Sequence, residues 1–153
     1  MTRSNARELA LHLIYAMDCG GADAEEVLQS RLDGEYFSLL AEENELYAEQ
    51  PKGKHRAYIE SVVRGVAEQR ESLDAEIAAL SENWSLGRIS SLARAIMELA
   101  IYEAQFVADV PMNVAIHEAV LLAKKYEEAE TVSFVNGVLG AFSRKKTPQE
   151  PTC

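Results

Sequence analysis

Residues 133–142 read SFVNGVLGAF, and the Asn136–Gly137 pair inside this stretch decides between a β-hairpin and a helix. An Asn-Gly pair between apolar residues is the strongest short-range signal for a hairpin turn. The apolar residues around the pair, however, recur mostly at intervals of three, which fills one face of a helix and shows no period-two alternation. We therefore predict a helix over residues 131–143.

Two glycines, Gly137 and Gly140, lie three residues apart on this predicted helix. Each costs about 1 kcal/mol relative to alanine inside a helix. That loss is tolerated more easily where another helix packs closely over the missing side chains. We therefore interpret the two glycines as a packing notch.

The same helical spacing of apolar residues runs through most of the chain and predicts further helices over residues 5–17, 23–32, 54–80, 89–106 and from Pro111 to Tyr126. Residues 33–53 have no clean period, so they are either helical or irregular, and we expect them to be the most mobile part. The pattern predicts an all-α, single-domain bundle of six or seven helices over residues 1–146, followed by a polar tail over residues 147–153.

Some details of these helices are specific enough to be checked. Asn5, with Glu8 three residues later, is typical of a helix N-terminal cap. The helix over residues 89–106 is apolar on more than one face, so we expect it to be buried on several sides. Trp84 is expected to fill the corner in the turn at residues 81–87. For the next helix along the chain we expect burial of Val114, Ile116, Ala119, Val120 and Ala123.

Composition is that of an ordinary globular domain, with 153 residues, 48% of them hydrophobic and 26% charged. No apolar run approaches the length of a membrane span. The N-terminus interleaves charged and apolar residues, unlike a secretory signal. Cys19 and Cys153 lie in no metal or redox motif, and two free thiols fit a cytoplasmic protein.

The net charge of −10 is concentrated in one segment. Residues 18–50 hold ten acids and one base, Arg31, whereas the rest of the chain is nearly balanced. A basic face elsewhere, and therefore a nucleic-acid partner, is compatible with this distribution. The simpler interpretation is that the acids solvate a surface segment.

The sequence predicts neither an enzyme nor a cofactor. His117-Glu118 resembles the start of a zinc-binding H-E-x-x-H motif, but the second histidine is replaced by Leu121. No histidine has a partner at metal-ligand spacing. Phosphate-binding, dinucleotide-binding and nucleophile-elbow motifs are absent as well.

Two small clusters instead suggest binding of an anionic, unpaired nucleic acid. Arg3 and Arg7 share one face at the positive end of the first helix. Lys124 and Lys125 precede Tyr126, whose ring offers a surface for an unstacked base. The alternative is that the arginines are solvated and that the lysines complement the helix dipole.

Two longer motifs resemble the bacterial NusB family of transcription antitermination factors. The run VPMNVAIHEAVLLAKKY at residues 110–126, followed by FVNGVL at residues 134–139, is similar to that family's C-terminal signature. ARELALHLIY at residues 6–15 and RAIMELAIYE at residues 94–103 resemble its opening and central helices. The likeness weakens only between about residues 18 and 55.

This resemblance implies an all-helical fold of two packed helical subdomains and no catalytic activity. It also implies binding of the boxA element of nascent RNA together with NusE, a ribosomal protein, in an antitermination complex with RNA polymerase that reads through ribosomal RNA operons. By position, the RNA-binding residues would be Arg3, Arg7, Lys124, Tyr126 and Ser133. The partner-binding residues would be Tyr15, Arg94 and Glu98, while Asn136 and Gly137 would serve packing and capping.

Three positions depart from the family pattern. His117 replaces a usual asparagine, Glu98 stands where an arginine is common, and Gly140 where an aspartate is common. The reversed charge at Glu98 bears on the partner surface. Two other functions stay open: a protein-interaction module or homodimer with reduced RNA binding, and a stand-alone relative of the RNA-binding domain of ribosomal RNA cytosine methyltransferases.

Overall fold

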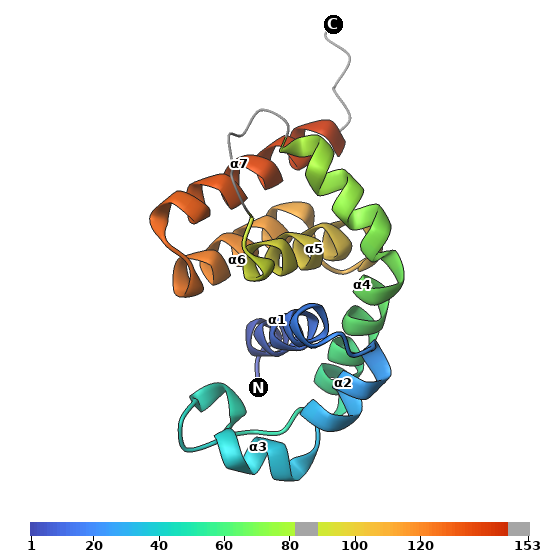
Figure 1. The fold of residues 1–153 in the computed structure, drawn as a ribbon, viewed down its shortest axis with the longest axis vertical. Helices are drawn as coiled ribbons and strands as arrows, with labels where there is room; N and C mark the ends of the chain where they lie inside the picture. Colours follow the sequence, from blue (N-terminus) through green and yellow to red (C-terminus); the bar gives the residue numbers. More distant parts are fainter. Residues whose placement is uncertain (82–88, 147–153) are drawn as a thin grey trace, which may run out of the picture. The chain divides into compact units, whose positions relative to one another are not determined.

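The computed structural model describes residues 1–81 and 89–146, and in these residues it contains helices and no strand (Figure 1). The prediction of an all-α fold is therefore confirmed for this part of the chain. The elements are α1 (Arg3–Gly20), α2 (Ala24–Arg31), α3 (Gly34–Leu40), the 3-10 turn η1 (Glu45–Tyr47), α4 (Gly53–Leu80), α5 (Ser91–Phe106), α6 (Met112–Tyr126) and α7 (Ala129–Lys146).

The chain divides into two compact units, Met1–Arg70 and Glu71–Cys153. The first unit contains α1, α2, α3, η1 and the first part of α4. The second unit contains the last part of α4 together with α5, α6 and α7. Each unit has its own buried apolar residues.

Helix α1 begins earlier than its predicted cap. Thr2 is the N-cap, and its hydroxyl accepts a hydrogen bond of 3.0 Å from the backbone N–H of Asn5. The expectation that Asn5 caps this helix is therefore wrong, because the helix already begins at Arg3 and the Thr2 side chain caps it. The helix also ends three residues later than predicted, at Gly20: Gly21 adopts a left-handed conformation with φ of 68°, and its N–H donates to the carbonyl of Met17.

Residues 33–53 have more regular structure than their sequence suggested. Asp33 caps α3, and Asn44 caps η1 through a hydrogen bond of 3.0 Å to the N–H of Leu46. Phe37 and Tyr47 are buried, with their ring centroids 4.9 Å apart. Aromatic packing, rather than a repeated apolar stripe, holds this segment in the first unit.

Helix α5 is buried on several sides, as predicted, with nine of its residues buried. Its N-cap is Ser90, whose hydroxyl oxygen accepts from the N–H of Ala93 at 3.0 Å and whose O–H donates to Glu127 at 2.8 Å. One hydroxyl therefore both starts α5 and holds the residue that follows α6. The prediction for Trp84 lies outside the described residues.

Helix α6 buries Ala119 and Ala123 as predicted, but the predicted burial of Val114, Ile116 and Val120 is wrong. Val114 is 38% exposed, and Ile116 and Val120 are only half-buried. The buried residues are Ala115, Ala119, Leu122 and Ala123. Since α6 packs against both α5 and α7, its small alanines occupy the contacts and its larger apolar residues lie at the edge.

Helix α7 confirms that Asn136–Gly137 is no hairpin turn, because this pair lies in the middle of an 18-residue helix. Its inner face consists of Phe134, Val135, Val138, Leu139 and Phe142. The prediction that another helix packs closely over Gly140 is wrong. Among the described residues, a methyl group placed there would meet only Nη1 of Arg144, at 3.4 Å.

The open surroundings of Gly140 predict that alanine is better tolerated there than glycine. Gly140→Ala should raise the free energy of unfolding by roughly 0.5–1 kcal/mol, because it adds helix propensity and displaces only the end of a flexible side chain. Chemical denaturation measures this change. Ala141→Gly, one position later on the same helix, is the control and should lower stability; a destabilised Gly140→Ala protein would contradict the interpretation.

Candidate nucleic-acid interface

The two arginines of the first turn differ in exposure. Arg3 is half-buried, and its guanidinium carbon lies 4.4 Å from the centroid of the Tyr58 ring. This cation–π contact orients the charge at the start of α1. Arg7, one turn later, is 3% exposed and is engaged inside the protein. Its burial disfavours direct contact with RNA, and the RNA-binding role of both arginines stays a prediction.

The end of α6 presents its predicted residues on the surface. Lys124 is exposed, Tyr126 is 37% exposed, and Nζ of Lys125 lies 5.5 Å from the centroid of the Tyr126 ring. Ser133 is exposed on the neighbouring helix α7. Three of the five predicted RNA-binding residues thus lie in the second unit, on two helices that pack against each other.

A groove of about 470 Å³ is lined by residues of these two helices. Its apolar floor consists of Ile116 and Val120, which the alanine contacts of α6 leave at the edge. The other lining residues are Asn113, His117, Asn136, Gly140, Ser143 and Arg144.

Neither the apolar spacing nor the charge pattern of the sequence predicts this groove. Asn136 was expected to serve packing and capping, but it is exposed in the middle of α7. His117 and Gly140, two of the three departures from the family pattern, both line the groove. The sequence indicated the groove only indirectly, because the residues that depart from the family pattern at positions 117 and 140 lie on successive predicted helices.

The predicted partner-binding residues differ in their surroundings. Tyr15 is 39% exposed on α1, and Arg94 is half-buried on α5. Glu98 is 1% exposed and has an interaction inside the protein. The acidic residue that replaces the family's usual arginine is therefore inside the fold. Its burial disfavours direct contact with a partner. The partner-binding roles of all three residues stay predictions.

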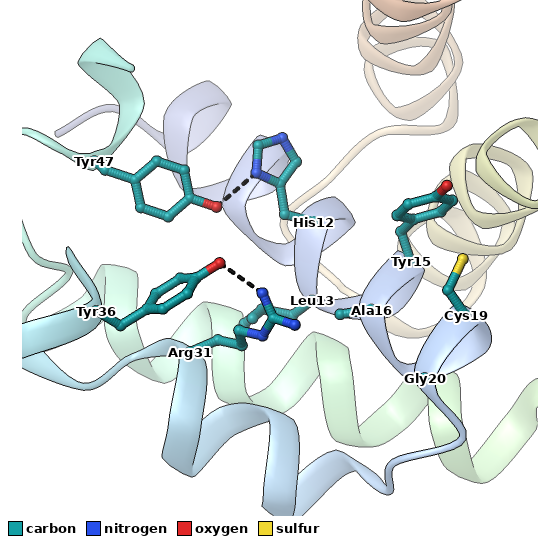
Figure 2. Close-up of a pocket in the computed structure, with 9 residues that line it drawn as sticks. All are labelled: His12, Leu13, Tyr15, Ala16, Cys19, Gly20, Arg31, Tyr36 and Tyr47. Carbon is teal, nitrogen blue, oxygen red and sulfur yellow. Dashed lines mark hydrogen bonds between the residues drawn. The ribbon is translucent and has the colours of Figure 1, made fainter. Parts of the chain in front are cut away.

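Tyr15 also lines a cavity of about 400 Å³ in the first unit (Figure 2). His12 Nδ1 lies 2.8 Å from the hydroxyl of Tyr47, and Arg31 donates a 2.6 Å hydrogen bond to the hydroxyl of Tyr36. Arg31, the one base of the acidic segment, is thus held by a tyrosine. Burial, reinforced by the neighbouring Tyr36, raises the pKa of Tyr47 to about 12.

Metal and membrane sites find no support in the described residues. Within residues 1–81 and 89–146, no three histidine, cysteine or acidic side chains are grouped so as to hold a metal ion. None of the helices described has the length and hydropathy required to cross a bilayer.

Comparison with known proteins places these features in a family context. The model of the NusB family matches residues 4–144. The transcription antitermination protein NusB of Thermoanaerobacter sp. (strain X514) is 34% identical over 150 residues, covering 98% of this chain and 96% of the relative. The corresponding protein of Geobacter sulfurreducens is 35% identical over 137 residues, covering 90% of each chain.

Solved structures show the same fold. The T. maritima NusB structure has a TM-score of 0.77 at 27% identity, with 97% of this chain and 95% of that chain covered. A structure of the antitermination factors NusB and NusE in complex with dsRNA has a TM-score of 0.71 at 23% identity, with 94% and 96% covered. The second likeness supports the fold alone.

The burial of Arg7 predicts a structural role that Arg3 does not share. Arg7→Ala should lower the free energy of unfolding by about 2 kcal/mol, because it removes a buried aliphatic stem and its polar interactions. Arg3→Ala should cost about 1 kcal/mol or less, the range of a partly exposed cation–π contact. Thermal and chemical denaturation of both variants test this difference; equal stability of the two would contradict it.

The pKa of Tyr47 predicts a late step in alkaline titration. Its phenol should stay protonated until about pH 12, since burial penalises the phenolate. Because this pKa is raised on folding, the associated stability is present below the unfolded value and is lost as the pH rises through the folded value. Ultraviolet titration of tyrosinate should lose its latest component in Tyr47→Phe; an unchanged titration curve would refute the assignment.

Proposed function

The chain belongs to the NusB family, and we propose on this basis that it is a cytoplasmic transcription antitermination factor. In this proposal it binds boxA-type single-stranded RNA together with NusE and promotes read-through of ribosomal RNA operons by RNA polymerase. The family match over residues 4–144 is the observation that carries the proposal.

The surface at the end of α6 supports RNA as the ligand. Proteins usually recognise RNA sequence on unpaired strands, by stacking bases on aromatic rings and placing cations near phosphates. Tyr126 offers an exposed ring, and Lys124 and Lys125 offer the cations on the same turn. Ser133 adds a hydroxyl from the adjacent helix.

The small number of available cations predicts weak binding by the protein alone. Arg3, Lys124 and Lys125 together would neutralise about three phosphates, which gives a slope of log K against log salt of about −2 on single strands. A basic NusE would supply further positive charge. We therefore expect the assembly with NusE to bind RNA more tightly than this chain alone.

One alternative has specific support. The burial of Arg7 and the ten acids in residues 18–50 favour a protein-interaction module with reduced RNA binding, which includes a homodimer. Such a module would bind NusE but would show no RNA affinity even in its presence.

Titration of boxA-type RNA with the protein alone and with NusE separates these functions. We expect NusE to increase affinity, and Tyr126→Ala to weaken binding roughly ten-fold, as expected for loss of one base–aromatic stack. Tyr126→Phe should retain most of the affinity because the ring remains. Phe106→Ala is a matched control, since Phe106 is also an exposed aromatic of the second unit, at 52% exposure. Equal losses in Tyr126→Ala and Phe106→Ala would reject the assignment.

A further inference from the structure

The groove between α6 and α7 continues from the predicted RNA-binding residues. On α6, Lys124 lies one turn after Val120 of the groove floor. On α7, Ser133 lies about one turn before Asn136 of the groove wall. The chain reverses direction between α6 and α7 (Figure 1). Lys124, near the end of α6, and Ser133, near the start of α7, therefore both lie beyond the same end of the groove.

We propose that this groove carries the unpaired RNA strand onward from Lys124 and Ser133 to Arg144. The proposal rests on the function proposed above and extends its RNA-binding surface to residues that the sequence did not predict to bind RNA. From Asn113 to Lys124 the groove side of α6 is about 16 Å long at 1.5 Å per residue.

The charge of the groove suits a phosphate. None of the eight residues that line it is acidic, although the chain has a net charge of −10. Arg144 is exposed, and within the described residues no carboxylate lies within ion-pair distance of it. By contrast, Lys145 and Lys146 both pair with Glu76, at 3.3 and 3.7 Å. Arg144 is therefore the cation of the last turn that remains available to an anion.

The polar rim and apolar floor together suit a nucleotide. The side chains of Asn113, His117 and Asn136 are exposed and have no hydrogen-bond partner among the described residues. Amides pair well with base edges, and an imidazole stacks on a base. Ile116 and Val120 provide the apolar surface for a flat ring.

Gly140 lines the groove and adds no side chain to it. In the part of the chain that the structure describes, the end of the Arg144 side chain is the group that a methyl at this position would approach. A carboxylate at this position would stand four residues before Arg144 on the same helix, where it would pair with the guanidinium. It would also place a negative charge on the proposed path of the phosphates. Gly140→Asp, which introduces the residue that is common in the family, therefore tests whether this RNA path is particular to this chain.

The test is a titration of an unpaired boxA-type RNA in the presence of NusE at several salt concentrations. Gly140→Asp and Arg144→Ala should each weaken binding about five-fold or more, and Arg144→Ala should reduce the magnitude of the salt slope by about 0.7. Lys146→Ala is the matched control, because it removes one charge from the same turn outside the groove. It should change affinity less than two-fold. Gly140→Ala should also leave affinity within two-fold, since it adds no charge.

The outcomes are distinguishable. If Tyr126→Ala weakens RNA binding and Gly140→Asp and Arg144→Ala do not, the groove proposal is overturned and the proposed function stands. If Lys146→Ala weakens binding as much as Arg144→Ala, only general charge matters and the groove proposal is also overturned. If Gly140→Asp reduces the affinity for NusE without RNA, the groove is a protein-binding site instead. Absence of RNA binding by the unaltered protein with NusE would overturn both proposals.

Discussion

The close packing of α6 through alanine is the constraint on which the second unit depends. Ala115, Ala119 and Ala123 lie one turn apart, so they let α6 contact both α5 and α7. Small residues at a helix contact leave the larger apolar residues at its edge. Ile116 and Val120 consequently form the floor of a surface groove instead of filling the core. The packing thus determines where this unit offers an apolar surface to a ligand.

Buried charge is the second feature that shapes the molecule. Arg7, Glu8, Glu98 and Glu103 are each at most 9% exposed, and each has an interaction inside the protein. Burying ions is costly, and removal of one partner leaves the other uncompensated. These residues therefore constrain the fold more than they add surface for binding. Motif positions that look like a cationic or acidic surface in sequence are, for Arg7 and Glu98, part of the interior.

Periodicity predicted the helices well and their faces less well. The inner face of α7 is strongly apolar on one side, so its buried residues and the rejection of a hairpin followed directly from spacing. Helix α6 has apolar residues on adjacent stripes, and spacing alone cannot choose between Val114 and Ala115. The burial of Arg7 and Glu98 results from tertiary contacts, which a local sequence pattern cannot predict. The cavity beside Tyr15 depends on aromatic contacts of residues 33–53, which have no repeating stripe. The groove beside Gly140 exists because no other helix packs over that residue within the described part of the chain, and the sequence alone does not show this.

The hydroxyl of Ser90 restricts how this position can vary. It accepts from the N–H of Ala93 and donates to Glu127 at the same time. Threonine retains both functions, and asparagine retains them through its two amide atoms. Aspartate, an equally good cap in isolation, has no proton to donate and would stand against a second carboxylate. Fewer residue types should therefore be tolerated at position 90 than at an ordinary helix N-cap. An aspartate at position 90 should occur in relatives only together with a change at Glu127.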